Sequence, residues 1–261
     1  MKICRVTNES FARPRYALVE DSTLRLLDES KLFEQIIVSS DDDSLTLEQV
    51  ELLAPVTPSK VVCVGRNYCE HAAELGNKMP EEPLLFLKPP SSVIATGDRV
   101  ELPTLSQQVE HEGELGVVIG RAARKLSETD DPLSYVFGYT CINDVTARDL
   151  QRKDIQFTRG KSFDTFCPVG PWIVTDLDPT NATVTTRVNG EVKQNGNTAD
   201  MAFPVSFLIR YISGIMTLYP GDLIATGTPA GVSRMKHGDT VEVEIGGIGV
   251  LRNSIYDPNH A

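Results

Sequence analysis

Long apolar stretches are missing from this sequence, and so is any excess of basic residues. No run of about 20 apolar residues, the length that a membrane-spanning helix requires, occurs in it. Residues 1–16 carry charged and polar side chains throughout and lack the apolar segment of a secretory signal. Lysine and arginine number 25 against 36 acidic residues, and the net charge of -11 opposes binding to nucleic-acid phosphates. We therefore expect a cytoplasmic protein with neither a membrane nor a nucleic acid as its partner.

Paired cysteines are missing as well. The five cysteines form an odd number and contain no Cys-x-x-Cys pair, which argues against a disulfide framework and against a zinc site. Reduced thiols, buried as small apolar side chains in a cytoplasmic protein, explain the pattern better. These residues are Cys4, Cys63, Cys69, Cys141 and Cys167.

The composition is that of an ordinary globular protein. Hydrophobic residues make up 41% and charged residues 23% of the 261 residues, which excludes a wholly disordered chain. A chain of this length can bury roughly 70–75% of its unfolded surface, so it can fold without disulfides or a structural metal. Pro55 and Pro58 bracket a stiff connector. We therefore expect a small β-rich N-terminal domain over residues 1–57 and a larger domain over residues 58–261.

Strand patterns outnumber helix patterns along the chain. The segments that look like short strands are residues 15–21, 22–28, 61–65 and 240–245. Convincing helix patterns follow Asn67 and cover residues 204–216, where Pro204 can occupy the first turn. The acidic stretch at 39–44 predicts a solvated loop. Because the regular strand–helix alternation of a Rossmann fold or an α/β barrel is missing, the sequence predicts a mixed, strand-rich α+β fold.

Neighbouring acidic residues precede the apolar run at residues 115–120. Side chains at i and i+2 of a strand share a face, so Glu112 and Glu114 are expected to point the same way. Two adjacent carboxylates repel each other unless a cation lies between them, and oxygen ligands suit Mg2+, Mn2+ or Ca2+ better than zinc. Glu110 has the same parity, so the spacing leaves open which pair binds. The alternative is an exposed edge strand with a solvated acidic face.

Residues 138–151 predict a strand that runs into the start of a helix. Asn143 or Asp144 falls near the helix cap, and a capping role for Asp144 would be worth about 1 kcal/mol. Arg148 and Gln151 are three residues apart and share a helix face. A cation and an amide on that face can hold a carboxylate substrate, or they can pair with surface acids.

A short helix with a histidine and a glutamate on one face is expected after residue 66. Asn67 and Glu70 have the spacing of a capping box, and Gly76 is a natural stop. His71 and Glu74, three residues apart, can hydrogen-bond to each other. A carboxylate that orients an imidazole can activate water as a nucleophile. The alternative is an ordinary surface ion pair.

Two further segments place polar side chains beside glycine. Lys161, within residues 158–164, is a candidate clamp for an oxyanion or a carboxylate, and the alternative is an exposed loop lysine. Thr228 lies among small residues at 225–231, a segment without the Gly-Lys-Ser/Thr end of a nucleotide P-loop. Its hydroxyl and backbone N–H groups can approach a ligand closely, or the segment only forms a turn.

Taken together and in this order, these segments resemble the fumarylacetoacetate hydrolase family. The matching stretches cover nearly all of residues 60–234, whereas residues 1–57 resemble only the small, variable N-terminal domain of many bacterial members. The stretches are VGRNYCEHAAELG, LFLKPPSSV, HEGELGVVIG, GYTCINDVTARDLQ, RGKSFDTFCPVGPWIV, VNGEVKQ and LYPGDLIATGTPAGV.

The resemblance implies a mixed β-sandwich roll over residues 58–261, with a small N-terminal domain, and a catalytic divalent cation. The cation is usually Mg2+ or Mn2+, with Ca2+ as a stand-in in crystals, and it is held by three acids. On this sequence those acids are Glu112, Glu114 and Asp144, which decides against Glu110. The resemblance also implies a homodimer.

The same resemblance gives roles to the remaining candidates. His71 and Glu74 match the water-activating dyad of the family, and Lys161 matches its active-site lysine. Positions that contact the keto-carboxylate end of the substrate are matched by Arg148, Gln151 and Thr228. The implied substrate is therefore a small anionic 2-oxo acid.

A cation-bound 2-oxo acid can react in more than one way, because the same enolate forms when different bonds break. We expect a divalent-metal-dependent hydrolase that cleaves the C–C bond of an acylpyruvate-type diketo acid to pyruvate and a carboxylic acid. The presence of His71 and Glu74 motivates this expectation. The alternative is an isomerase, tautomerase or decarboxylase that acts on oxaloacetate or on a 2-hydroxymuconate-type dienoate. A binding protein without catalytic activity is the non-enzymatic alternative.

Overall fold

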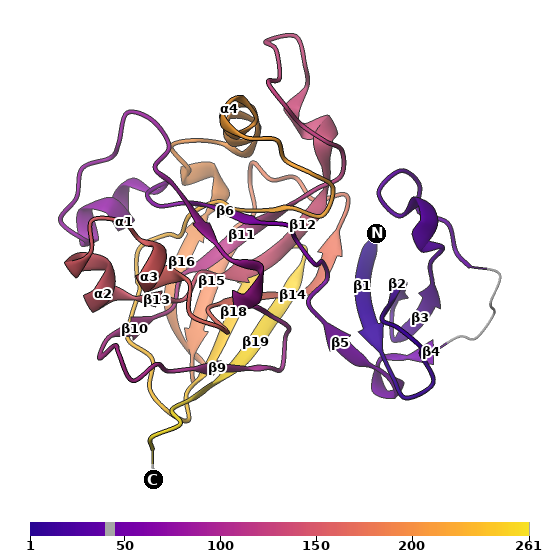
Figure 1. Ribbon diagram of the computed structural model, residues 1–261, viewed down its shortest axis with the longest axis horizontal. Coiled ribbons are helices and arrows are strands. Elements are labelled where there is room, and N and C mark those ends of the chain that lie inside the picture. The colour runs from indigo at the N-terminus through magenta and orange to yellow at the C-terminus, as the bar shows by residue number, and fades with distance from the viewer. Residues whose placement is uncertain (40–44, 261) are drawn as a thin grey trace.

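The computed structural model describes residues 1–39 and 45–260, and most of that chain lies in strands and their connections (Figure 1). The described strands form two large sheets and a two-stranded ribbon, so the predicted strand-rich α+β class is confirmed. The predicted acidic loop at 39–44 lies almost wholly outside the described residues. The α-helices are α1 (Cys69–Glu74), α2 (Arg148–Lys153), α3 (Thr158–Lys161) and α4 (Val205–Ile215).

The larger sheet follows the order β4-β3-β2-β1-β14-β12-β11-β17-β6-β7, with β5 beside β1 and β8 beside β14. Its neighbours are antiparallel except for the β17–β6 and β14–β8 pairs in the described part of the chain. The strands from β6 onward are β6 (Val61–Val64), β7 (Leu85–Lys88), β8 (Val93–Ile94), β11 (Gly113–Ile119), β12 (Val136–Asn143), β14 (Cys167–Val174) and β17 (Leu223–Ala225).

The smaller sheet follows the order β16-β15-β18-β19-β9, and β19 and β9 run parallel. Its strands are β9 (Arg99–Glu101), β15 (Thr183–Val188), β16 (Glu191–Asn197), β18 (Thr240–Ile245) and β19 (Gly249–Tyr256). Thr240–Ile245 has alternating burial, as its sequence predicts. The ribbon pairs β10 (Val109–Glu110) with β13 (Thr146–Ala147).

The main hydrophobic core lies between the two sheets. Leu115, Val117 and Ile119 occupy alternate positions of β11, and they share one buried cluster with Val184 and Val243 of the smaller sheet. The buried face of α4 belongs to the same cluster. Because apolar side chains from two sheets face each other across one core, the predicted mixed β-sandwich is confirmed.

The N-terminal strands extend the larger sheet at the side of the molecule drawn on the right in Figure 1. β1 pairs with β14 through Lys2 opposite Val174 and Ile3 opposite Ile173. Trp172 of β14 packs against both the main core and the small cluster formed by the N-terminal strands. These strands are β1 (Lys2–Thr7), β2 (Arg15–Glu20), β3 (Thr23–Leu26), β4 (Leu45–Thr46) and β5 (Glu51–Leu53).

The predicted helix patterns are found with one local error. α4 begins directly after Pro204, and α1 ends before Gly76, which has the positive φ of +69° typical of a helix stop. The predicted capping box of Asn67 and Glu70 is wrong, because α1 begins at Cys69. The buried Asn67 amide instead donates to the Phe203 and Thr226 carbonyls. None of the helices described here has both the length and the apolar character that crossing a membrane would demand.

The helices α1, α2 and α3 gather on the side of the molecule opposite the N-terminal strands (Figure 1). α2 contacts α3 and β10, and α3 also contacts β7 and β13. Sequence segments that lie far apart along the chain thus meet at the ends of β11 and β12, where the candidate site lies.

Candidate metal centre and active site

Three buried carboxylates converge where β11 and β12 pair. Each of Glu112, Glu114 and Asp144 offers an oxygen atom, and these atoms lie within 4.8 Å of one another. The antiparallel register places Gly113 opposite Asn143, so the residues beside this pair come from both strands. The Asp144 amide also donates to the Glu112 carbonyl over 2.8 Å. Asp144 does not cap a helix, because α2 begins at Arg148 with Ala147 as its cap residue.

A glycine between the two glutamates allows the sheets to approach closely at this point. A Cβ atom on Gly113 would lie 2.1 Å from the Thr186 hydroxyl of the smaller sheet. Glu112 and Glu114, on either side of it, point away from that sheet toward Asp144. The acidic face is buried, so the alternative of an exposed edge strand is wrong.

Cationic side chains surround two of the three carboxylates. Lys161 Nζ lies 2.7 Å from Glu112 Oε2 and 2.5 Å from Asp144 Oδ2, and Lys88 Nζ lies 2.5 Å from Asp144 Oδ1. Arg148 forms an ion pair with Glu112. Lys161 is buried at the end of α3, so the alternative of an exposed loop lysine is wrong. We refer to these three carboxylates and three cationic groups as the carboxylate centre.

Glu114 differs from its neighbours, because no cationic side chain in the described residues lies within ion-pair distance of it. It accepts a hydrogen bond from the Gly227 amide over 2.8 Å. Burial raises the pKa of Glu114 well above its usual range, and Asp144 and Glu112 raise it further. At Glu112 burial also favours a higher pKa, but Lys161 and Arg148 outweigh it and hold the pKa below its usual range. A divalent cation among the three carboxylates would supply the charge that Glu114 lacks, so these residues fit such a cation.

Each nitrogen of the Arg148 guanidinium forms a hydrogen bond with a protein group. Its Nε donates to Glu110 over 2.7 Å, one terminal nitrogen pairs with Glu112, and the other donates to Gln151 Oε1 over 2.6 Å. Glu110 lies outside the three-carboxylate group and serves as a partner of Arg148. The expected substrate contacts of Arg148 and Gln151 stay predictions, and what the structure shows directly is that Arg148 orients Glu112.

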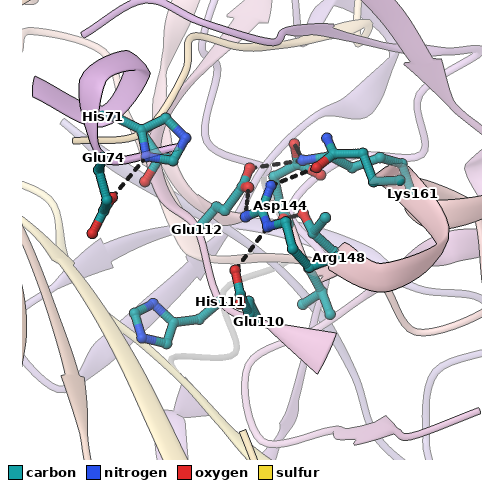
Figure 2. Close-up of polar contacts among 12 residues, drawn as sticks. His71, Glu74, Glu110, His111, Glu112, Asp144, Arg148 and Lys161 are labelled. Carbon is teal, nitrogen blue, oxygen red and sulfur yellow. Dashed lines mark hydrogen bonds and ion pairs between the residues drawn. The ribbon is translucent and has the colours of Figure 1, made fainter. Parts of the chain in front are cut away.

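The histidine and glutamate of α1 lie on the other side of Glu112 from Lys161 (Figure 2). His71 Nδ1 is 3.2 Å from Glu74 Oε2, and His71 is buried while Glu74 is partly exposed. The Glu74 carboxylate also accepts hydrogen bonds of 3.0 and 3.2 Å from the Gly231 amide. We call His71 and Glu74 the dyad. In the tautomer with Nδ1–H directed at the carboxylate, Nε2 is the ring nitrogen that carries the lone pair.

Residues 226–231, which we call the bridging loop, link the carboxylate centre to the dyad. Its Gly227 amide donates to Glu114 and its Gly231 amide donates to Glu74. Between them, the Thr228 hydroxyl donates to the Gly113 carbonyl over 2.8 Å and accepts from Gln194 over 2.7 Å. The single hydroxyl proton of Thr228 is therefore used inside the protein. Contact of Thr228 with a substrate stays a prediction.

Several residues of the site escaped prediction because their partners are distant in sequence. Lys88 is 56 residues from Asp144, and Gln194 is 81 residues from Gly113. Both belong to stretches that carry the family resemblance, LFLKPPSSV and VNGEVKQ, but neither has a local pattern that marks a role. The same holds for buried His111, which contacts Gln194 at 3.2 Å and Ser233 at 2.9 Å. Burial lowers the pKa of His111, which favours its neutral form.

Comparison with known proteins supports what the geometry indicates. Residues 60–256 match the family described as fumarylacetoacetate (FAA) hydrolase, C-terminal, and residues 1–55 match a family described as Rv2993c-like, N-terminal. The chain is similar to oxaloacetate tautomerase YisK of Bacillus subtilis, with 44% identity over 80% of this chain and 74% of the relative. It is also similar to the human mitochondrial oxaloacetate tautomerase FAHD2A, with 46% identity over 81% of this chain and 71% of the relative.

Solved structures agree with the sequence comparison. The fold resembles the crystal structure of 2-hydroxyhepta-2,4-diene-1,7-dioate isomerase from Mycobacterium marinum, with a TM-score of 0.88 and 41% identity. That likeness covers 99% of this chain and 99% of the other. It therefore includes the N-terminal strands as well as the site. The chain belongs to the fumarylacetoacetate hydrolase family of enzymes.

Proposed function

We propose that this protein is a divalent-metal-dependent tautomerase that interconverts the keto and enol forms of oxaloacetate. The observation that carries the proposal is the similarity, at 44% and 46% identity, to two proteins named oxaloacetate tautomerase. These relatives and the isomerase neighbour support the tautomerase alternative better than the C–C bond hydrolase that we expected from the family resemblance and the dyad. The buried carboxylates and the dyad provide the groups that such a reaction needs.

The carboxylate centre is where the metal would be held. Glu112, Glu114 and Asp144 would bind Mg2+ or Mn2+, because three carboxylate oxygens suit hard cations. When bound, a divalent cation supplies Lewis acidity that stabilises negative charge on a 2-oxo acid. Counting Glu110, four carboxylates face three cationic side chains here, and the added charge would make the site positive. A positive site attracts a dianionic substrate into a protein whose net charge is negative.

The reaction itself is a transfer of one proton between carbon and oxygen. In the keto-to-enol direction, a base removes a proton from C3 and the keto oxygen gains a proton, so that no atom is lost. His71 is the base in this proposal, because Glu74 engages its Nδ1 and leaves the other nitrogen available. The Lys161 ammonium adds positive charge beside the carboxylates, where it would stabilise an enolate oxygen.

The test follows enol absorbance and product release in one sample. Enol oxaloacetate is mixed with enzyme and Mg2+ or Mn2+, and loss of the enol absorbance is followed beside an assay for pyruvate. We expect rapid loss of the enol form without pyruvate, and an uncatalysed rate after treatment with EDTA. An enol decay no faster than that of buffer containing the same metal would refute the proposal. Release of pyruvate in step with enol loss would instead identify a decarboxylase.

Hydrolysis of an acylpyruvate is the second candidate function, and the dyad favours it. A carboxylate-oriented imidazole 3.2 Å from its partner can activate water as well as it can move a proton from carbon. The same preparation is therefore offered acetylpyruvate and fumarylpyruvate. Metal-dependent release of pyruvate and a carboxylic acid would support the hydrolase, and its absence together with enol conversion would leave the tautomerase.

A further inference from the structure

We propose that Gln194 is a positioning residue that sets the geometry of both the carboxylate centre and the dyad through the bridging loop. The inference rests on the proposed function, since it concerns the same site. Gln194 lies on β16, in the smaller sheet, and none of its side chain is exposed. It touches none of the three carboxylates or the dyad itself, so its influence has to pass through the groups that it binds.

The Gln194 amide makes hydrogen bonds with both of its ends. Oε1 accepts from the Gly113 amide over 2.9 Å and lies 3.2 Å from His111 Nδ1. Nε2 donates to the Thr228 hydroxyl and to the Pro229 carbonyl, both over 2.7 Å. One primary amide thus satisfies backbone groups of β11 and of the bridging loop together. A buried amide with this set of partners is expensive to replace, because each group left unpaired costs free energy.

These contacts form a closed ring around one glycine. The Gly113 amide donates to Gln194, Gln194 donates to the Thr228 hydroxyl, and that hydroxyl donates back to the Gly113 carbonyl. Because every donor and acceptor in the ring has its partner, Gln194 and Thr228 have one arrangement relative to β11. The ring includes the amide and the carbonyl of Gly113, the residue between Glu112 and Glu114. It therefore holds the backbone from which two of the carboxylates project.

The ring also anchors the middle of the bridging loop, and the two ends of this loop contact the carboxylate centre and the dyad. Gly227 donates to Glu114 on one side of Thr228, and Gly231 donates to Glu74 on the other. The backbone of strand β16 approaches the loop closely, because a Cβ atom on Gly231 would lie 2.0 Å from the Lys193 carbonyl oxygen. The neighbour of Gln194 on β16 therefore lies close against the loop at its dyad end. A loop released from Gln194 would loosen the hydrogen bonds to Glu114 and to Glu74 together.

The experiment compares Gln194→Met with the wild-type protein. Methionine has a similar length but no comparable donor or acceptor, so the ring opens while the core stays filled. We expect faster hydrogen–deuterium exchange across residues 226–231 and an Mn2+ dissociation constant at least fivefold higher by electron paramagnetic resonance. At saturating Mn2+ we expect kcat for oxaloacetate tautomerisation to fall at least tenfold.

Thr228→Val and the double variant test whether the ring is the route. If Gln194 acts through Thr228, the double variant Gln194→Met/Thr228→Val should be no worse than Gln194→Met alone. If the losses of Mn2+ affinity and kcat in the two single variants add fully in the double variant, Gln194 does not act through Thr228 and the ring is refuted as the route.

Asn253→Leu is the matched control for a general loss of stability. Asn253 is a buried amide that donates to the Ala95 and Asp98 carbonyls and contacts none of the site residues described above. The Asn253→Leu variant should have a lower melting temperature than the wild type, with unchanged Mn2+ affinity and unchanged hydrogen–deuterium exchange in residues 226–231. If Gln194→Met behaves in the same way, Gln194 is only structural and the proposal fails. Because Mn2+ binding and exchange need no substrate, a wild-type enzyme without tautomerase activity would overturn the proposed function alone.

Discussion

The carboxylate centre and the dyad use the same kinds of side chain but hold them in different ways. In the carboxylate centre, Glu112 and Asp144 each meet two cationic groups, and all these side chains are buried. The dyad consists of one imidazole and one carboxylate on the six-residue helix α1, and the Glu74 side chain is 32% exposed. One region is fixed by ion pairs between distant segments, whereas the other depends on a short helix and a single loop contact.

This difference indicates how the work of the site is divided. Ion pairs in a buried site are strong but costly, because each charge loses its hydration and has to be matched by its neighbours. A centre of this kind holds its carboxylates in place for a cation. The dyad needs only to move a proton, and a partly exposed glutamate at a helix end can adapt while it does so. Substitutions in the two regions should therefore differ in the size of their effects.

The largest effect is expected for Glu114→Gln. Glu114 has no cationic partner in the described chain, so its charge is the one that a bound cation would compensate. We expect Mn2+ affinity to fall by more than the roughly 10–100-fold that loss of an outer-shell partner causes, and metal-dependent activity to disappear. Titration calorimetry and the enol assay measure both. Glu110→Gln is the matched control, and an equal loss of Mn2+ affinity there would contradict the assignment.

The next effect is expected for Lys161→Met. Removal of this ammonium leaves Glu112 and Asp144 with one cationic partner each, and breaking a buried pair costs about 3–5 kcal/mol. We expect a matching loss of unfolding free energy in urea, partly restored by Mg2+. Catalysis should fall by roughly 10²–10³-fold if the ammonium stabilises the enolate. Normal kcat in a folded variant would show that Lys161 serves only the centre's stability.

Glu74→Gln tests the dyad with a smaller change. The amide oxygen can still accept from Gly231, so the loop contact is kept while the carboxylate that orients His71 is lost. General acid–base groups contribute roughly 10²–10⁴-fold, and we expect a loss at the lower end of that range. Metal affinity should stay close to the wild-type value. If it falls as it does in Glu114→Gln, the two regions are not separable.

The pH dependence of the metal-free protein gives a subtler contrast. The pKa of Glu114 is raised in the folded state above its ordinary value of 4.5, so the folded protein holds this proton more tightly than the unfolded chain. Protonated Glu114 therefore stabilises the folded protein below pH 4.5, and this stabilisation is lost as the pH rises through the pKa that Glu114 has in the folded state. In EDTA, the melting temperature of the wild type should therefore fall relative to Glu114→Gln as pH increases above 4.5. A constant difference between the two proteins would show that Glu114 is not perturbed.

The smallest effect is expected for an ion pair that water can reach. Arg187 and Glu244 lie across β15 and β18 with their charged atoms 2.6 Å apart, and both side chains are partly exposed. Pairs of this kind contribute about 0.2–1 kcal/mol, because solvent and salt screen them. Arg187→Ala should change unfolding free energy by no more than that and leave kinetics unaltered. A loss as large as that of Lys161→Met would mean that burial is not what separates the carboxylate centre from the surface.

Much of the fold was accessible from local patterns. Alternating apolar residues predicted the strand at 240–245, and the amphipathic stretch at 204–216 predicted α4 to within one residue at each end. The failure at Asn67 has a clear cause: its spacing to Glu70 suits a cap, but burial against Phe203 and Thr226 satisfies the amide elsewhere. Tertiary contacts therefore overrode a local signal where the chain passes beside the site.

In the candidate site, too, local patterns predicted some features and tertiary contacts decided the others. The parity of Glu112 and Glu114 and the spacing of His71 and Glu74 are short-range features, so the sequence alone determined which side chains could face one another. It also determined the absence of basic clusters and of long apolar runs. Family resemblance added Asp144 and excluded Glu110. None of these features shows which charge each carboxylate meets.

Only the tertiary structure decided how those charges are balanced. Lys88 reaches Asp144 across 56 residues of sequence, Arg148 turns to Glu110 and Glu112, and Glu114 has no cationic partner in the described chain. Electrostatic energy depends on distance through space and on exclusion of water, and neither quantity can be read from spacing along the chain. The strands determined by the sequence supply the carboxylates, and their packing determines that a cation would fit beside Glu114.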